Sequence, residues 1–386
     1  MTRPLNRVYT AMPTSVFEVM SQLAREHNAI NLGQGFPDDP GPEDVRRKAA
    51  EAVIDGNNQY PPMLGLPELR SAVSAHYQHW HGLTLDPQTE VMVTSGATEA
   101  ISGALFGLIE PGDEVVAFAP AYDAYLPLIR RAGGIPRIVR LEPPEWRLTE
   151  EALRQVFNPK TKVVCFNNPQ NPAAIVYPRE DLQLLARFCQ EFDVIAVCDE
   201  VWEHVLFDGR AHIPLTTLPG MRERTVKVGS AGKIFSLTGW KVGFVCATPA
   251  ILRVLGKVHQ FLTFTTPPNL QAAVAYGLAK EDAFFHDLRC DLQRSRDRLS
   301  AGLTSIGFPV IPAQGTYFLN VDIKPLGLNE TDEAFCRRLV TEHRVAAIPV
   351  SSLYEDDPVT SVIRFCFAKR DATIDEALQR LSHAVR

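Results

Sequence analysis

A regular alternation of strand and helix patterns between residues 90 and 247 constrains the fold more than any other feature of the sequence. Short apolar stretches predict strands, and amphipathic stretches between several of them predict helices, for instance over 97–109 and 179–191. The alternation predicts an α/β fold with a mostly parallel seven-stranded sheet between helices. Such a sheet binds ligands at the carboxyl ends of its strands. The predicted strands are 90–94, 114–118, 136–141, 162–166, 193–198, 225–229 and 242–247.

The pattern changes beyond residue 268, where two longer helical stretches lead to short strands and further helices. We expect this part to form a smaller α+β domain. Residues 1–45 lie outside the alternating region, and we expect them to pack with the smaller domain. A chain of 386 residues is long enough for both domains. The predicted division is an N-terminal segment (1–45), a large domain (46–284) and a small C-terminal domain (285–386).

Composition argues against several classes of protein. The formal net charge is −6 and no basic run is present, so no nucleic-acid partner is predicted. The N-terminus lacks the apolar core of a signal peptide and no stretch has the length of a membrane span, so no membrane partner is predicted. The seven cysteines are dispersed without a CxxC pair, which predicts reduced thiols and a cytoplasmic protein. Neither the cysteines nor the histidines show ligand spacing, so no metal site is predicted.

One lysine stands on a turn of small residues between two apolar strands, in the segment Ser230-Ala231-Gly232-Lys233. The small neighbours leave room for a bulky group at the Lys233 amine, and Ser230 and Lys241 can hold an anion nearby. An amine that forms a Schiff base with a phosphorylated carbonyl cofactor needs this arrangement. Taken alone, the same pattern also fits a solvated loop lysine.

An acidic residue, Asp199, follows the apolar strand predicted over 193–198. Such a strand is buried on both faces, and a buried carboxylate without a partner is costly. We therefore expect Asp199 to face a cation or a protonated nitrogen. A pyridinium nitrogen is one such partner, and a metal ion or a structural arginine are the alternatives.

Three further patterns could carry binding groups. Ala97 and Thr98 begin a predicted helix after a strand, where free N–H groups suit a phosphate, although a plain helix cap has the same pattern. Asn171 lies between two Asn-Pro turns and can direct its amide at a ligand, or serve the turn alone. Arg364 interrupts the apolar strand 361–367, where it would bind a carboxylate bidentately or form a buried structural ion pair.

Taken together, these positions resemble the class I, fold-type I aminotransferases that depend on pyridoxal 5′-phosphate. The resemblance extends from Asn31 to Lys369 and is greatest to kynurenine–oxoglutarate/glutamine aminotransferases and bacterial methionine aminotransferases. It rests on the order and spacing of several segments. They are NLGQGFPD (31–38), NQY (58–60), SAGK with TGWKVG (230–243), VHQFLTF (258–264), GTYF (315–318), VAAIPVS (345–351) and IRFCFAK (363–369).

The resemblance implies how the cofactor would be bound. Lys233 would hold pyridoxal phosphate as a Schiff base and would move the substrate α-proton. Asp199 would pair with the pyridine nitrogen, Asn171 would bind the phenolic oxygen, and Tyr122 would stack on the ring. Small and polar residues would bind the phosphate: Ala97, Thr98, Ser230, Lys241 and, from the neighbouring subunit, Tyr60.

The resemblance also implies a substrate site at the interface of a homodimer. The α-carboxylate of the amino acid would be held by Arg364, Asn171 and the Gly35 N–H. Phe264 would line the side-chain pocket across the interface. Three positions depart from the family pattern. Ala174 stands two residues after Pro172, where many relatives carry a glycine. Trp202 stands in place of a tyrosine that donates to the cofactor, and Val16 replaces a tryptophan that some kynurenine-using relatives place beside the substrate.

We therefore expect an aminotransferase that moves the amino group of an apolar, aromatic or sulfur-containing amino acid, or of glutamine, to a 2-oxo acid. No second arginine for a distal carboxylate is apparent. A carbon–sulfur β-lyase and a succinyldiaminopimelate aminotransferase remain alternatives. Ser230-x-x-Lys233 also matches the SxxK of serine acyl-transferring enzymes, but their SDN and KTG elements do not occur in the sequence. A non-catalytic regulator on the same fold would carry an added DNA-binding domain, for which we see no segment.

Overall fold

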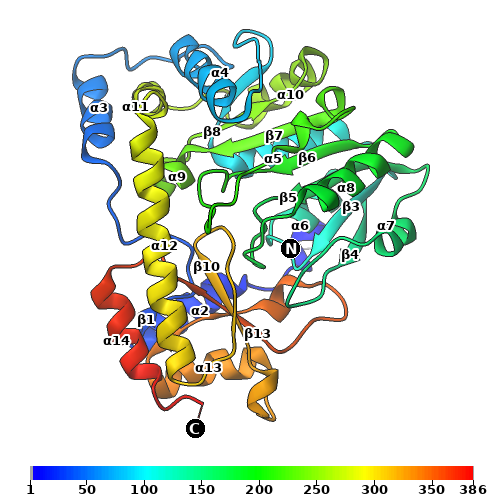
Figure 1. Ribbon diagram of the computed structural model, residues 1–386. Coiled ribbons are helices and arrows are strands. Elements are labelled where there is room, and N and C mark those ends of the chain that lie inside the picture. The colour runs from blue at the N-terminus through cyan, green and yellow to red at the C-terminus, as the bar shows by residue number, and fades with distance from the viewer. Residues whose placement is uncertain (1–2, 386) are drawn as a thin grey trace.

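The centre of the computed structural model, which describes residues 3–385, is a seven-stranded sheet (Figure 1). Its strand order is β2-β8-β7-β6-β5-β3-β4, and of these strands β8 alone runs opposite to the other six. The seven strands and their mostly parallel arrangement are thus confirmed. Their bounds are β2 Val91–Thr94, β3 Glu114–Ala119, β4 Ile135–Arg140, β5 Thr161–Asn167, β6 Ile195–Asp199, β7 Thr225–Ser230 and β8 Gly243–Cys246.

Position in the sheet explains why the strands differ in composition. Every residue of β3 is buried, because this strand lies inside the sheet and helices cover both of its faces. β4 lies at the edge of the sheet, and its first four residues alternate between exposed and half-buried. In Figure 1, α8 lies in front of the sheet and α5 lies behind it.

The helices around this sheet follow the predicted alternation. Their bounds are α3 Glu43–Ile54, α4 Pro67–His81, α5 Gly96–Leu108, α6 Tyr125–Arg131, α7 Glu150–Val156, α8 Arg179–Glu191, α9 Ala231–Ile234, α10 Pro249–Leu262 and α11 Pro268–Leu278. Short 3₁₀ turns occupy Leu215–Thr217, Arg222–Arg224 and Thr238–Trp240. Within residues 3–385, no helix combines the length and the apolar character that crossing a membrane would require.

The C-terminal part contains a second, antiparallel sheet of the order β12-β13-β10-β9. Its helices are α12 Asp282–Ser305, α13 Asp332–His343 and α14 Asp371–Leu381. Further 3₁₀ turns lie at Lys324–Leu326 and Val350–Leu353. Its strands are β9 Val310–Ile311, β10 Phe318–Asp322, β11 Val345–Ala346, β12 Ile348–Pro349 and β13 Val362–Cys366. A small α+β unit therefore follows the large sheet.

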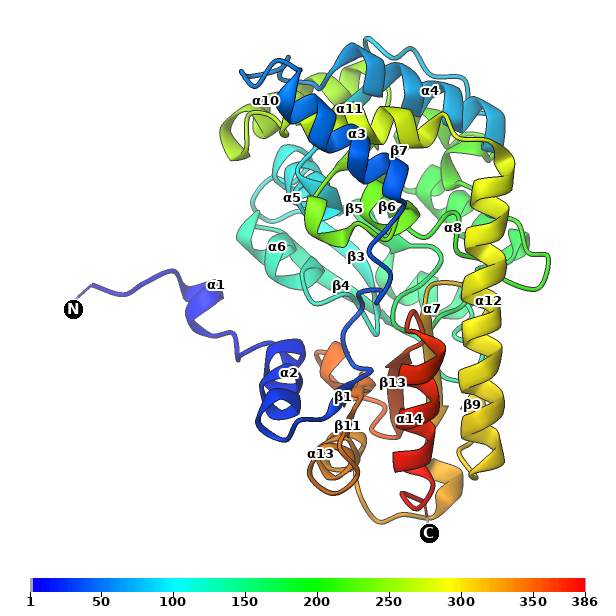
Figure 2. The same ribbon diagram turned by 90° about the vertical axis from the view of Figure 1, so that its left-hand side faces the viewer.

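The N-terminal segment lies against this C-terminal unit. β1 (Ile30–Asn31) pairs in parallel with β11, and α2 (Val16–Glu26) packs on α13 and β12. α1 (Arg7–Thr10) instead contacts α6, and Figure 2 shows the N-terminal segment projecting from this side of the molecule. Packing of residues 1–45 with the small domain stays a prediction, which the contacts of β1 and α2 favour and the contact of α1 with α6 does not. The domain bounds at 45 and 284 stay a prediction, and α12 runs without a break across the second of them.

Candidate active site

A cavity of about 560 Å³ lies at the carboxyl ends of β5, β6 and β7. The C-terminal unit contributes Phe318 and Arg364 to its lining, and α2 contributes Phe17 and Glu18. Segments far apart in the sequence therefore meet here, at the edge of the sheet where a ligand was expected. The predicted site residues that line the cavity are Gly35, Ala97, Thr98, Tyr122, Asn171, Asp199, Trp202, Ser230, Lys233, Lys241 and Arg364.

Lys233 lies on the short helix α9 that directly follows β7. Its Nζ donates a hydrogen bond to the hydroxyl of Tyr317 at 3.0 Å and lies 4.7 Å from the centre of the Trp202 ring. Burial among these rings lowers the pKa of the Lys233 amine to about 8, against the opposing attraction of Asp199. A lysine in this state loses its proton more readily than an exposed lysine, as a nucleophile or a general base requires.

Asp199 ends β6 and is almost fully buried. Its Oδ2 accepts a hydrogen bond from the Tyr125 hydroxyl at 2.5 Å. Burial raises the pKa of this carboxyl group, and the Tyr125 hydrogen bond opposes the rise. Within residues 3–385, no cationic side chain forms an ion pair with Asp199. Its Oδ1 accepts a long hydrogen bond of 3.4 Å from the Val201 N–H, which leaves it able to meet a cationic or protonated ligand group in the cavity.

The start of α5 and the start of β8 form a tight cradle. A Cβ atom on Gly243 would lie 2.6 Å from the Gly96 carbonyl carbon and 2.8 Å from the Ala97 nitrogen, so only glycine fits. Gly96 has φ +75°, and a Cβ there would lie 3.1 Å from Cε of Lys241. The close approach brings the Lys241 side chain beside the first N–H groups of α5, which have no partners within the helix. An anion such as a phosphate suits this position.

Arg364 lies on β13, and its side chain is almost fully buried. One terminal nitrogen donates to Asn171 Oδ1 at 2.7 Å and the other to the Gly33 carbonyl at 3.1 Å. The guanidinium carbon lies 3.8 Å from the centre of the Phe318 ring. Burial lowers the pKa of Arg364 to about 10. Within the described chain no carboxylate pairs with this cation, so a carboxylate on a ligand would complete its environment.

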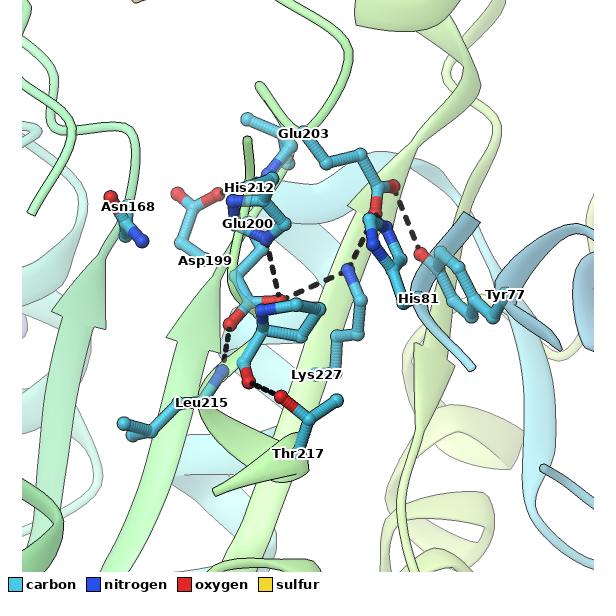
Figure 3. A network of polar contacts seen from close by, with 12 residues as sticks. Tyr77, His81, Asn168, Asp199, Glu200, Glu203, His212, Leu215, Thr217 and Lys227 are labelled. Carbon is cyan, nitrogen blue, oxygen red and sulfur yellow. Dashed lines mark hydrogen bonds and ion pairs between the residues drawn. The ribbon is translucent and has the colours of Figure 1, made fainter. Parts of the chain in front are cut away.

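A buried network of charges lies beside Asp199 (Figure 3). Glu200 and Glu203 converge on Lys227 Nζ at 3.1 and 2.7 Å, whereas the Asp199 carboxylate points away from it. Burial raises the pKa of Glu203, but the attraction of Lys227 outweighs it, so this pKa lies well below its usual range. All three side chains are at most 1 % exposed. The network anchors the end of β6, on which Asp199 stands.

Three predicted residues do not line the cavity. Val16 packs against the hydrophobic core instead, because the first turn of α2 directs its neighbours Ser15 and Phe17 to the cavity. Its predicted place beside the substrate does not match the structure of this chain. Tyr60 and Phe264 form an edge-to-face pair, with ring centres 5.4 Å apart, outside the lining. Both were predicted to act on a neighbouring subunit, so their exposure is compatible with that role.

The sequence pattern of the family "Aminotransferase class I and II" matches residues 27–381. The chain belongs to this family. The aminotransferase is 42% identical to a probable N-succinyldiaminopimelate aminotransferase of Mycobacterium tuberculosis, over 96% of both chains. The solved structure of the N-succinyldiaminopimelate aminotransferase from that organism superposes with a TM-score of 0.95 at 41% identity, covering 99% of this chain and 100% of that one.

Two further relatives carry other names. Identity is 38% to the methionine aminotransferase of Escherichia coli, over 95% of both chains. It is 37% to human kynurenine–oxoglutarate transaminase 1, over 93% of this chain and 94% of that one. The predicted family and the fold-type I architecture are therefore confirmed, as is a transaminase that depends on pyridoxal 5′-phosphate.

The aminotransferase presents donors and acceptors that fit this cofactor. Lys233 offers an amine, and Asp199 offers a buried carboxylate without a cationic partner. The cradle of Gly96, Gly243 and Lys241 leaves no room for a side chain but presents N–H groups and a cation to a phosphate. The individual roles given to these residues from the sequence remain proposals that this arrangement supports.

Sequence reasoning missed two tyrosines that bond the central groups of the aminotransferase. Tyr125 donates to Asp199, and Tyr317 accepts from Lys233. A signal for the first was its place three residues after Tyr122, and the two rings indeed meet edge to face with centres 5.6 Å apart. Tyr317 belongs to the GTYF segment, which was used for the family resemblance but not for the site.

Replacing Gly243 with alanine is expected to weaken binding of pyridoxal phosphate to the apoenzyme at least about tenfold, since a misplaced phosphate contact costs on the order of 1–3 kcal/mol. The new Cβ would meet backbone atoms of Gly96 and Ala97, which cannot move aside as a flexible side chain would. The dissociation constant would be measured by titrating the apoenzyme and following cofactor absorbance. Gly239→Ala is the matched control, because a Cβ there meets no atom within 4 Å. Equal affinities of the two variants would contradict the cradle.

Proposed function

We propose that the preferred substrates are amino acids with an uncharged apolar, aromatic or sulfur-containing side chain, or glutamine, with a 2-oxo acid as amino acceptor. The distribution of charge along the cavity carries this proposal. Its lining cations are Lys233, Lys241 and Arg364, and each has a proposed partner: the cofactor carbonyl, its phosphate and the substrate α-carboxylate. The side chains at the outer part of the lining include Glu18 and Asp123. A distal carboxylate on the substrate would meet these acids rather than a free cation.

Aromatic surface supports the same choice. Phe17, Phe36 and Phe318 line the cavity together with Ile101 and Trp202. Apolar side chains bind such a surface by the hydrophobic effect, and a thioether also makes favourable contacts with aromatic rings. Methionine and phenylalanine are therefore the side chains that we expect to bind best.

The reaction would use the residues described above. Arg364, with Asn171, would bind the α-carboxylate and so orient the substrate α-carbon toward the Lys233 amine. Lys233 would take the α-proton as a general base and return a proton as a general acid. Asp199 would keep a protonated ring nitrogen charged. The cofactor, when bound, supplies the electron sink that makes the α-proton acidic enough to remove.

We further propose that two copies of the chain complete each active site. The exposed pair of Tyr60 and Phe264 supports this proposal, as does the exposed Phe261, because large apolar side chains gathered on a surface indicate an interface. The extended N-terminal segment carries Leu5 and Tyr9, which are also exposed. A cytoplasmic location is proposed as well, because the described cysteines are free and all but Cys290 are buried.

A second candidate substrate is N-succinyl-LL-2,6-diaminopimelate. It is favoured by the 42% identity to the mycobacterial relative that bears this substrate in its name. The acyl group makes this donor long and partly neutral, but it carries distal carboxylates. Residues of a second subunit would have to bind them, since the described lining of one chain offers acids instead.

The experiment that ranks the donors follows the visible absorption of the holoenzyme in a stopped-flow instrument. The enzyme is mixed separately with L-methionine, L-glutamine, L-phenylalanine, L-aspartate and N-succinyl-LL-2,6-diaminopimelate. We expect methionine to react at least about 100-fold faster than aspartate, since an unpaired buried charge costs several kcal/mol. Fastest reaction with the succinylated donor would reject the proposed substrate class in favour of the second candidate. Release of pyruvate and ammonia from cystathionine would reveal the β-lyase instead.

A further inference from the structure

The phenol ring of Tyr317 is held rigidly beside Lys233. The residue directly precedes β10 and is 1 % exposed. The preceding residue, Thr316, has φ +64°, an unfavourable conformation for a β-branched residue that persists only where surrounding contacts impose it. Here the Thr316 N–H donates to the Val205 carbonyl at 2.9 Å, and the Gly315 N–H donates to the Ala174 carbonyl at 3.1 Å. The loops that follow β5 and β6 thus fix the backbone that presents Tyr317.

The direction of the hydrogen bonds at the Tyr317 hydroxyl is determined by their partners. The hydroxyl lies 2.8 Å from the Gly35 carbonyl oxygen, which can only accept. The single hydroxyl proton is therefore used for Gly35, and the bond with Lys233 at 3.0 Å must run from the amine to the phenol oxygen. Among residues 3–385, Tyr317 is the one hydrogen-bond partner of the Lys233 amine.

Trp202 shapes the same corner of the site without offering such a bond. Its ring meets that of Tyr317 edge to face, with centres 4.4 Å apart and planes at 88°. The Lys233 Nζ lies over both rings, 4.7 Å from the centre of the first and 5.3 Å from that of the second. The indole forms no hydrogen bond with the described residues. Of these two rings, Tyr317 is thus the one whose polar atom forms a hydrogen bond with the Lys233 amine.

We propose that Tyr317 is a positioning residue of the aminotransferase, whose phenol oxygen fixes the direction of the Lys233 amine during its proton transfers. The Gly35 carbonyl fixes the phenol in turn, and Gly35 belongs to the segment expected to bind the substrate carboxylate. Arrival of substrate and orientation of the amine are therefore linked through one hydroxyl. The proposal rests on transamination taking place in this cavity, but not on any particular amino donor.

Tyr317→Phe tests the proposal, because it removes the hydroxyl and keeps the ring that packs on Trp202. We expect kcat to fall about 10- to 100-fold, the cost of an amine whose reacting position is no longer fixed. KM should change less than about threefold, since the substrate contacts of Arg364 remain. The pH at which the visible band of the holoenzyme titrates should also shift, which a merely structural role would not cause.

Tyr177→Phe is the matched control. Tyr177 is equally buried, but its hydroxyl has no hydrogen-bond partner among the described residues, so its loss should leave kcat and the titration within about twofold of the wild type. The two variants would be compared with whichever donor reacts fastest. A failed substrate assignment would therefore leave this comparison intact. Wild-type kcat and an unshifted titration in Tyr317→Phe would overturn the proposal.

A double variant gives an independent test. Trp202→Tyr places a hydroxyl on the ring at position 202, which also faces the Lys233 amine. If Tyr317 acts through its oxygen, the added hydroxyl should restore kcat of Tyr317→Phe at least about threefold, and the two substitutions should not be additive. A double variant as slow as Tyr317→Phe, or slower, would show that Tyr317 contributes something other than this hydrogen bond.

Discussion

Lys233→Ala is expected to lower the rate of transamination by about four orders of magnitude, the upper end of what a positioned acid–base group contributes. The cavity lowers the pKa of this amine to about 8, which prepares it to remove a proton. The phosphate cradle and Asp199 do not depend on this side chain. The variant should therefore still bind pyridoxal phosphate, more weakly and without a covalent bond.

A single-turnover experiment measures this loss. The variant, saturated with cofactor, is mixed with the fastest donor, and the absorbance change is followed from milliseconds to hours. Small primary amines added to the solution should recover part of the rate, because they can enter the space left by the lysine side chain. Lys160→Ala serves as control, since this lysine is exposed on a loop far from the lining. A loss of less than about tenfold would contradict the role assigned to Lys233.

Lys227→Met is expected to lower the free energy of unfolding by about 3–5 kcal/mol, because it leaves two buried carboxylates without their shared cation. Methionine has nearly the same length, so the packing against the Tyr77 ring, now 4.3 Å from Nζ, should survive. Glu200 would keep His212 and the Leu215 N–H as partners, and Glu203 would keep hydrogen bonds from Tyr77 and His81. Denaturation by urea, followed by tryptophan fluorescence and circular dichroism, measures the change.

The same substitution predicts a pH dependence of known sign. In the wild type the pKa of Glu203 is held well below its usual range, so the pair contributes stability above the unfolded pKa that is lost as pH falls toward the folded value. Without Lys227, burial favours the protonated carboxyl groups. The difference in the free energy of unfolding between wild type and Lys227→Met should therefore become smaller as the pH is lowered from 8 to 5.

Two further variants separate charge from packing. Lys227→Met with Glu203→Gln should be more stable than Lys227→Met alone, because one uncompensated charge is gone. Arg47→Met breaks an exposed ion pair with Glu43 and should have little effect. If the double variant lost as much stability as Lys227→Met alone, the network would contribute through packing rather than through charge pairing.

The sequence was informative wherever a local pattern has a single physical cause. Strands such as β3 and β6 are continuous apolar runs because both of their faces are covered, and their ends could be read to within a few residues. Asp199 and Arg364 were recognisable because a charge within an apolar strand needs a partner. The antiparallel direction of β8 could not be predicted from the sequence, since the composition of a strand does not indicate whether its neighbours run parallel or antiparallel to it.

Contacts made across the chain explain what could not be predicted. Tyr317 reaches Lys233 over a separation of 84 residues, and only the tertiary packing that bends Thr316 reveals it. Val16 was expected beside the substrate, but a turn of about 100° per residue in a helix is enough to exchange it for Phe17. The Lys227 network joins residues from α4, β7 and the loop after β6, none of which carries a distinctive motif.

Helix α12 gives the two sheets of the molecule a mechanical connection (Figure 1). It buries Phe285 near its start and Leu299 and Leu303 near its end, whereas residues 286–294 between them include no buried side chain and no glycine or proline. A rod of 24 residues is about 36 Å long, so a swing of about 5° at Phe285 would carry its far end about 3 Å. Arg364 stands on β13 in the C-terminal sheet and Lys233 on α9 after the large sheet, so such a swing would displace the first relative to the second. A small rotation of α12 would therefore change the distance between the two side chains, Arg364 and Lys233, that are proposed to act on a bound amino acid.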